Sequence, residues 1–383
     1  MTTATMSNET PTRVPSVWRG LLWAWRRGGD GGGVTRTRLL WRALVATTRW
    51  GGAMRRWMSV VFELNSRGLM TDPAGEYMRA VRPYVHRHTS YSARVLQLID
   101  FVDWMESAFK PAALQKLLQG EDLVLAELQP PRGCDSMRLQ LRRAPVQSPE
   151  GELLLTLMVQ RSPDVQHNAQ PVEAAALGFS VFRLEGSGCL VIGGVRGPRH
   201  PVQRVSTVEI SQAMSGWKPS VLMVRVAQEL ARFWGLKLVG LNPSSHTLQG
   251  WTFQFNERHR NAAQRIYDSY DALWEHFGAT KGPPGWMVLP LDSDDKLAAT
   301  ALSPEKRERQ IRRADFWMRT RRRLHADARE LLQRPGREAR LSRATQSMQP
   351  DDDADWEDES PPSPQIIPPR KQRVLETGPA DLA

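Results

Sequence analysis

Cysteine is scarce in this chain, and long apolar runs are missing. Only two cysteines, Cys134 and Cys189, occur among 383 residues, which excludes a disulfide-built scaffold and a cysteine-rich zinc module. No apolar run reaches the roughly 18 residues that a membrane-spanning helix needs. The first residues, MTTATMSNETPTRVPS, have neither the basic nor the apolar region of a signal peptide. We therefore expect a cytoplasmic protein with no transmembrane span.

Tyrosine is also rare, with five residues against fourteen tryptophans. Basic residues outnumber acidic ones, 52 Lys and Arg against 41 Asp and Glu, so the formal net charge is +11. A hydrophobic share of 40% and a charged share of 24% are typical of a globular protein. These values exclude a chain that is disordered throughout. The basic balance favours anionic partners, such as phosphates or lipid headgroups.

The N-terminal third is predicted to be helical. Residues 1–14 are polar and aperiodic, which indicates a disordered tail. Residues 15–120 form the helical part, and its first half is rich in Trp and Arg. A glycine patch at residues 28–33 is predicted to separate two helical pieces, and the second piece has an amphipathic pattern. Two further helices are expected over residues 84–118, with Pro111 in the first turn of the second.

Residues 121–300 are predicted to be an α+β domain. Short apolar runs with turn-forming residues between them favour an antiparallel meander; they lie at residues 123–128, 137–141, 153–159, 179–184 and 190–195. Two helices follow, a short one over residues 205–214 and a strongly apolar one that begins at Pro219 and ends before Gly235. A strand, an amphipathic helix and a last strand are then expected over residues 236–241, 260–277 and 285–290.

The C-terminal part changes composition again. Residues 301–343 are predicted to form a basic helix that opens with Ser303 as N-cap and Pro304 behind it. Between residues 305 and 343 the sequence holds one Lys and thirteen Arg against six acids. Residues 344–383 are rich in Asp, Glu and Pro and are expected to be a disordered acidic tail.

Several motifs resemble those of the VirK/YbjX family of bacterial proteins. The family has a strand ending in Gly-Gly-x-Gln-Gly, a His-Gly-x-Arg-Pro-Lys element before an apolar helix, and a Gly-Val-Ser-x-x-x-His turn. The corresponding segments here are LVIGGVRGP at residues 190–198, MSGWKP at 214–219 and GLNPSSH at 240–246. The chain departs from the family at Arg196, Ser215 and Trp217. The resemblance spans about residues 35 to 325, and it implies a role in envelope maintenance, virulence or resistance to antimicrobial peptides.

The element order from residue 188 to 289 also resembles the second half of a GNAT-type acyltransferase. This resemblance implies an acyl-CoA or acyl carrier donor; no other cofactor is indicated. Backbone N–H groups at a helix start bind phosphates, so the predicted donor-binding residues are Arg196, Gly216, Trp217 and Lys218. A tyrosine on the last helix would act as the general acid, Tyr267 first and Tyr270 second. The alternative is that both tyrosines are core aromatics.

Other candidate catalytic residues are a carboxylate pair and two histidines. Glu150 and Glu152 flank Gly151, and Glu152 is the predicted catalytic carboxylate; the alternative is a solvated turn. His246, after a strand end, is the candidate general base, with His200 behind it, and the alternative is a surface or capping histidine. No metal-binding spacing of histidines occurs, and Cys189 is predicted to be a buried small hydrophobe.

Three surface functions remain open for the charged segments. The early Trp/Arg segment suits an anionic membrane surface, because Trp prefers the headgroup level and Arg pairs with phosphate. The Arg-rich helix would suit lipid headgroups or nucleic acid, although nucleic acid is the less favoured partner. The alternative is a solvated face. The leading hypothesis is thus an envelope-associated protein with acyltransferase chemistry, followed by a non-enzymatic adaptor for a membrane or protein partner, and then a nucleic-acid binder.

Overall fold

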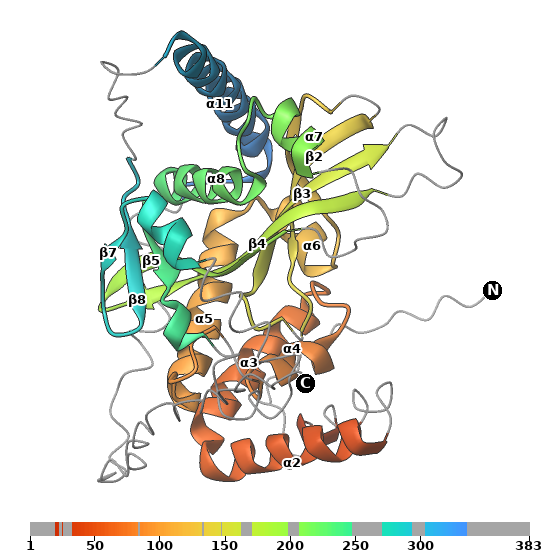
Figure 1. Ribbon diagram of the computed structural model, residues 1–383. Coiled ribbons are helices and arrows are strands. Elements are labelled where there is room, and N and C mark those ends of the chain that lie inside the picture. The colour runs from red at the N-terminus through yellow and green to blue at the C-terminus, as the bar shows by residue number, and fades with distance from the viewer. Residues whose placement is uncertain are drawn as a thin grey trace, which may run out of the picture. The chain divides into compact units, whose positions relative to one another are not determined.

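The computed structural model describes most of the chain between residues 20 and 334 (Figure 1). The described residues are 20–22, 25, 33–82, 85–131, 134–146, 148–161, 171–197, 207–246, 270–292 and 303–334. The predicted tails at both ends, and Tyr267 and His200, lie outside these residues. Among the described residues the structure is a mixed α+β fold with an eight-stranded, mostly antiparallel sheet.

Helices α2 to α6 precede the sheet in the described part of the chain, and local capping explains where several of them begin. Asp72, before α4, accepts a hydrogen bond from the Gly75 N–H, and Ser90, before α5, accepts one from the Ala93 N–H. Pro111 lies in the first turn of α6, as the sequence predicted. The sequence did not predict α4. The helices are α2 (Gly33–Arg49), α3 (Gly51–Ser66), α4 (Pro73–Arg79), α5 (Tyr91–Ala108) and α6 (Pro111–Leu118).

The predicted antiparallel meander is confirmed. Its strands pair each with the next along the chain, and together they form the first part of the sheet. The strand β4 is buried from Ala174 to Phe182 without alternation, so both of its faces are covered. The strands are β1 (Leu123–Leu128), β2 (Cys134–Arg143), β3 (Leu153–Arg161), β4 (Val172–Leu184) and β5 (Ser187–Arg196).

A helical crossover then connects two parallel strands. After the short α7 (Thr207–Ala213), α8 (Pro219–Trp234) carries the chain back to β6 (Lys237–Leu241), which pairs parallel with β5. Gly235 ends α8 in the left-handed conformation at φ 66°, as predicted. A 3-10 turn, η4 (Pro243–Ser245), follows β6.

The remaining strands complete the sheet order β1-β2-β3-β4-β5-β6-β8-β7. The predicted last strand is β8 (Trp286–Leu289), which pairs antiparallel with β6. Outside it lies the two-residue β7 (Thr280–Lys281), which the sequence did not indicate.

The C-terminal helix α11 (Pro304–Leu331) packs against the edge strand β1. Ser303 is its N-cap and Pro304 lies in its first turn, as the sequence predicted, although the Ser303 side chain makes no capping hydrogen bond. Phe316, Leu324 and Ala328 are the buried apolar residues of α11, a narrow stripe on a helix that is rich in charged residues.

Aromatic side chains join the helices to one another. Trp104 of α5 meets Trp234 of α8 edge to face, with ring centroids 4.8 Å apart. Phe109, just after α5, also contacts Trp234. The edge-to-face arrangement stabilises the fold beyond what the burial of such large rings contributes. In the part of the chain that the structure describes, no helix combines the length and the apolar character of a membrane span.

Candidate functional site

The strands β5 and β6 separate at their carboxyl ends. Their parallel pairing runs only as far as Ile192 and Gly240, whereas β5 continues to Arg196. Beyond the last pair, the Val195 N–H donates a hydrogen bond to the hydroxyl of Tyr270 at 2.7 Å. In open α/β sheets, ligands bind in the crevice outside the carboxyl ends of the strands, and β5 and β6 are parallel neighbours whose carboxyl ends lie on the same side of the sheet. The split between β5 and β6 is therefore the first place to examine for a functional site.

Tyr270 lies buried at this split. Burial, together with the nearby Glu150 carboxylate, raises the pKa of the Tyr270 phenol above its ordinary value. Because the hydroxyl accepts the Val195 N–H, its own proton remains to be donated elsewhere. Tyr270 was the second choice for the general acid, and the first choice, Tyr267, lies outside the described residues. Tyr270 is 2% exposed and belongs to the hydrophobic core, which agrees with the core-aromatic alternative, and its role as the acid stays a prediction.

His246 lies beside Tyr270. It follows η4, is only 1% exposed, and its ring faces the Tyr270 ring edge to face at 6.4 Å. Burial lowers the pKa of His246 to about 4, although a hydrogen bond with the backbone of Gly193 opposes the shift. The ring is thus neutral at pH 7 and a weak base. The surface alternative for His246 is wrong, because the side chain is buried.

Arg196, predicted to bind a donor, makes ion pairs with carboxylates on neighbouring segments. Its guanidinium pairs with Glu150 and, at 3.2 Å, with Glu173 of β4, which also pairs with Arg142 at 2.8 Å. These four residues form a chain of alternating charge that is partly buried. An anionic ligand at Arg196 would have to compete with two carboxylates, so the structure gives Arg196 a packing role.

The segment before α8 is held by α11. The Arg313 side chain donates to the Gly216 carbonyl at 2.6 Å, and the Trp217 indole donates to the Arg313 carbonyl at 3.1 Å. Trp217 is buried, whereas Lys218 is exposed at the N-cap of α8. Arg309 also lies next to Gly216. Three cationic side chains, Lys218, Arg309 and Arg313, therefore surround the start of α8.

The predicted catalytic carboxylate Glu152 lies in a different place. It is 1% exposed, and its Oε2 lies 3.1 Å from Arg79 and 3.0 Å from Arg143. Glu76 bridges the same two arginines, with both distances 2.9 Å. The solvated-turn alternative is thus wrong for Glu152, which belongs to a closed ring of two carboxylates and two guanidinium groups.

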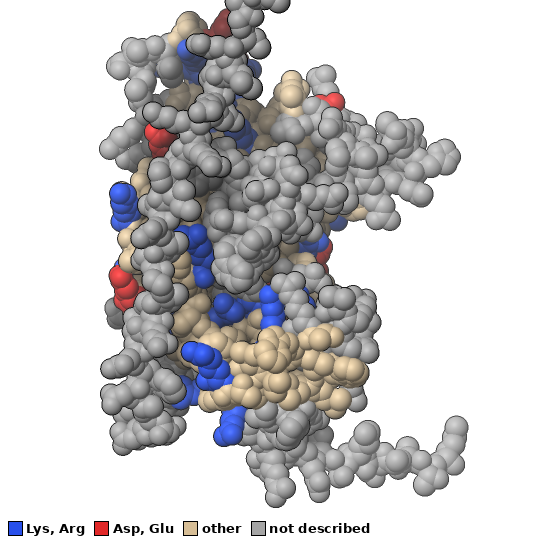
Figure 2. Space-filling model, turned by 60° about the horizontal axis from the view of Figure 1, so that its bottom comes forward, with Lys and Arg blue, Asp and Glu red and all other residues tan. Residues whose placement is uncertain are grey.

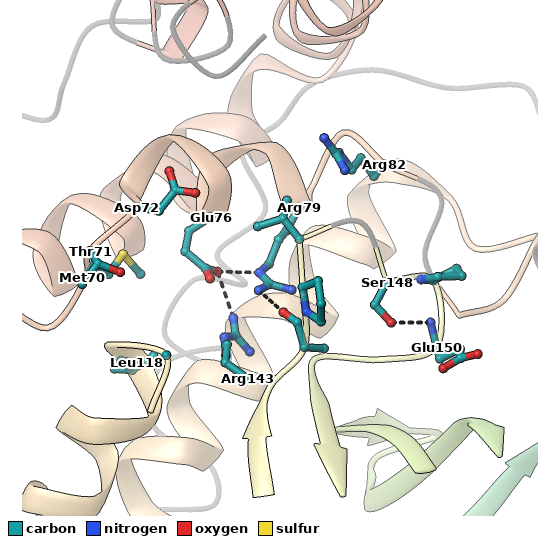
Figure 3. Close-up of a pocket in the computed structure, with 15 residues that line it drawn as sticks. Met70, Thr71, Asp72, Glu76, Arg79, Arg82, Leu118, Arg143, Ser148 and Glu150 are labelled. Atoms are coloured by element: carbon teal, nitrogen blue, oxygen red, sulfur yellow. Dashed lines mark hydrogen bonds and ion pairs between the residues drawn. The ribbon is translucent and has the colours of Figure 1, made fainter. Parts of the chain in front are cut away.

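This ring borders a cavity of about 540 Å³. Figure 3 shows Glu76, Arg79 and Arg143 directed toward one another beside it, with Arg82 and Asp72 farther out. Burial alone would raise the pKa of Glu76, but the charges of Arg143 and Arg79 outweigh it and lower the pKa. A carboxylate held in its ionised form by two arginines is a poor proton donor. The ring joins α4 to the end of the β2–β3 hairpin and does not form an acid–base pair.

Glycines in β4 and β5 make room for the segment that carries Glu150. A Cβ at Gly193 would lie 2.3 Å from the Glu150 carbonyl oxygen, and one at Gly194 would lie 2.6 Å from the Glu150 side chain. Gly178 of β4 faces the same residue at 2.6 Å. Only glycine allows this approach of backbone to backbone. The Gly-Gly motif therefore has a packing explanation.

The predicted residues thus divide into four groups. His246 and Tyr270 meet at the β5–β6 split, and Arg196 belongs to the chain of alternating charge. Gly216, Trp217 and Lys218 lie at the start of α8, and Glu152 belongs to the arginine ring. Cys189 is 2% exposed within β5, which confirms it as a buried hydrophobe. Across the described residues, no cluster of His, Cys, Asp and Glu is arranged to hold a metal ion.

The arginine ring is the feature that the sequence did not reveal. The ring joins Glu76 and Arg79 of α4 to Arg143, which lies 67 residues after Glu76, so no local spacing relates its two sides. The signal in the sequence was a pair of opposite charges three residues apart, Glu76 and Arg79. Such a pair is equally common on a solvated helix.

A known protein family matches almost the whole described part of the chain. Residues 35–325 match DUF535, a family described as a protein of unknown function. The chain belongs to this family. The match begins within α2 and ends within α11, so it includes the whole sheet, the β5–β6 split and the start of α8. No curated protein and no solved structure was found to match the chain.

Proposed function

We propose that this DUF535 protein is an acyltransferase that uses an acyl-CoA or acyl carrier donor and acts in maintenance of the bacterial envelope. The observation that carries the proposal is the start of α8. It has Lys218 at its N-cap, and Arg309 and Arg313 of α11 lie beside Gly216 just before it. A helix start with added cations suits the phosphate groups of such a donor.

The strand order supports this proposal. A run of antiparallel strands, then a helix that returns the chain to a parallel strand, then a final antiparallel pair resembles the GNAT-type order that the sequence suggested. In this proposal the donor chain enters at the split after Ile192 and Gly240. A likeness of fold is an analogy, so the function must be tested at the site itself.

Tyr270 supplies the chemistry in this proposal. A buried phenol with a raised pKa keeps its proton at pH 7 and can donate it to a leaving thiolate. Val195 positions the phenol oxygen through its N–H. His246, neutral and beside Tyr270, would shape the split rather than take the proton.

The envelope role comes from the family. DUF535 is the family that includes VirK and YbjX, and the segments at residues 190–198, 214–219 and 240–246 resemble motifs of that family. An acyl-transfer reaction suits such a role, since envelope lipids carry acyl chains. The envelope role thus bears on the acceptor of the acyl group, whereas the start of α8 bears on the acyl donor.

A thermal-shift experiment tests donor binding. The wild-type protein is heated with acetyl-CoA, a long-chain acyl-CoA or free CoA. A ligand at about 100 times its Kd stabilises the folded state by about 2.7 kcal/mol, or about 4 °C for a chain of this length. We expect this increase in Tm with an acyl-CoA, and we expect Lys218→Ala to reduce it.

A matched variant shows whether the effect is local. Lys281 is also exposed but lies in β7, at the opposite edge of the sheet order from β1 and away from α8 in sequence. Lys281→Ala should leave the increase in Tm unchanged. If no donor raises the Tm, or if the two lysine variants behave alike, the proposed donor site is wrong.

A second candidate is a non-enzymatic adaptor. The observation that favours it is that Trp217 and His246 are packed against their neighbours, as they would be in a protein without a reaction to perform. An adaptor of this kind predicts no response to any donor and an intact affinity for its membrane or protein partner in a Tyr270→Phe variant.

A further inference from the structure

The apolar residues of α2 divide into a buried and an exposed stripe. Ala43 and Ala46 are buried, and Thr47 lies 3.5 Å from the Tyr77 hydroxyl, so this stripe attaches α2 to the rest of the fold. Trp41 and Leu44, three residues apart, lie on the other side and are 65% and 42% exposed. Of the eight most exposed large apolar side chains among the described residues, four lie between residues 22 and 44.

An exposed tryptophan in this position needs a reason. Packing does not require it, because Ala43 and Ala46 already make the contact with the core. Burial of a large aromatic side chain is favourable by about 1.5–3 kcal/mol, and that free energy is unused while Trp41 faces water. A partner that covers Trp41 and Leu44 would recover it.

The charge beside this stripe has one sign. Arg42 and Arg49 lie seven residues apart along one side of α2, and the sequence has no acidic residue between Asp30 and Glu63. Figure 2 shows this side of the molecule, with the tan surface of α2 toward the viewer, blue Lys and Arg side chains at its edge and no red beside it. A protein partner of mixed charge would not need this bias, whereas a uniformly anionic surface would.

We propose that the exposed face of α2, centred on Trp41, Leu44 and Arg49, docks on an anionic lipid bilayer. The helix lies in the interface plane, with Trp41 and Leu44 at the level of the headgroups and the arginines on lipid phosphates. Trp is suited to this depth because its ring is apolar and its N–H is polar. The face is on a different element from the start of α8, so this proposal is independent of the donor site.

Co-sedimentation with vesicles tests the proposal on the full-length protein. The vesicles are pure phosphatidylcholine, or equal parts of phosphatidylcholine and phosphatidylglycerol. We expect binding to the mixed vesicles that is weaker at high salt, and little binding to the neutral ones. A double variant, Trp41→Ser with Leu44→Ser, should bind at least about tenfold more weakly. Arg49→Gln should weaken binding about fivefold, because each basic residue near such a surface contributes about 1 kcal/mol.

Matched controls come from α11, which is also basic. Ile311 is 61% exposed there, and Ile311→Ser and Arg307→Gln should leave vesicle binding unchanged. Because all of these side chains are exposed, we expect the variants to melt at the wild-type temperature, which shows that they are folded. The proposal is overturned if the wild type does not bind anionic vesicles, or if the α11 variants lose binding while the α2 variants keep it. Failure here would leave the CoA response unaffected, so the two proposals fail separately.

Discussion

Two sets of arginine–carboxylate pairs in this protein use the same chemistry in opposite surroundings. In the ring between α4 and the β2–β3 hairpin, the Arg79 and Glu152 side chains are 4% and 2% exposed. On α11, the Arg312 and Glu308 side chains are 61% and 67% exposed, although their N–O distance of 3.0 Å is almost the same. The distance between the charges therefore says little about what each pair contributes.

Solvent explains the difference. Water and salt screen an exposed pair, and ordering two long side chains costs entropy, so such pairs contribute about 0–1 kcal/mol. In the interior, removing one partner leaves the other charge buried without compensation, which costs about 3–5 kcal/mol. Arg79 has a further contact, since it donates to the Ala144 carbonyl at 2.6 Å. The ring is therefore the point at which the fold is most sensitive to substitution.

The largest expected effect is that of breaking the ring. Arg79→Met keeps the length of the side chain but leaves Glu76 and Glu152 with only Arg143 between them. We expect the free energy of unfolding to fall by about 3–5 kcal/mol, measured by urea denaturation. A loss below about 1 kcal/mol would contradict the comparison, because the buried pair would then behave like the exposed one.

Glu152 provides the control for function. Glu152→Gln keeps the shape and removes the charge, so a structural role predicts lower stability, with any transfer activity retained in the molecules that remain folded. A catalytic role would predict the reverse, a stable protein without activity.

The fold was largely accessible from the sequence. Alternating and continuous apolar runs located β1 to β6 because strand burial repeats locally, and Pro219 and Gly235 marked both ends of α8. The short α4 was missed because its last five residues are all buried, the charged Glu76 and Arg79 included, so no apolar period marks a buried face. The edge strand β7, with two exposed residues, had no apolar signal at all.

The site was less accessible, for a physical reason. His246 and Tyr270 were both candidates, but their meeting at the β5–β6 split depends on tertiary packing. Glu152 was singled out as a catalytic carboxylate, and its pairing with Arg79 and Arg143 could not be anticipated, since the three lie in different elements. Similarly, Gly193 and Gly194 stood out as a motif, whereas the reason for them is the approach of Glu150.

His246 is a buried group, and burial keeps its ring neutral instead of charged. The pKa of His246 is about 4 in the folded protein and about 6.5 when unfolded. The unfolded state therefore binds a proton first as the pH falls, so stability is full above about pH 6.5 and is lost toward pH 4. Between pH 7 and pH 5 this histidine should cost about 2 kcal/mol of the free energy of unfolding.

Urea denaturation at several pH values measures this loss, with His246→Asn as the comparison. Since the variant has no imidazole to protonate, its free energy of unfolding should fall less between pH 7 and pH 5 than that of the wild type. His86, whose pKa burial also lowers to about 4, contributes equally to both proteins. Identical pH dependence in the two would show that His246 is not the buried base described here.

The smallest change in the free energy of unfolding is expected on α11, which carries the exposed pairs. Arg312→Ala removes an exposed i,i+4 pair with Glu308, and Ala is itself a good helix former. We expect the free energy of unfolding to change by no more than about 0.5 kcal/mol. Urea denaturation at low and high salt measures it, and salt should remove what difference there is, whereas the loss in Arg79→Met should persist because buried charges are screened much less. If Arg312→Ala lowered the free energy of unfolding by about 1 kcal/mol or more at high salt as well, this part of α11 would be shielded from solvent. Solvent exposure would then not explain why the two sets of ion pairs differ in their contribution to stability.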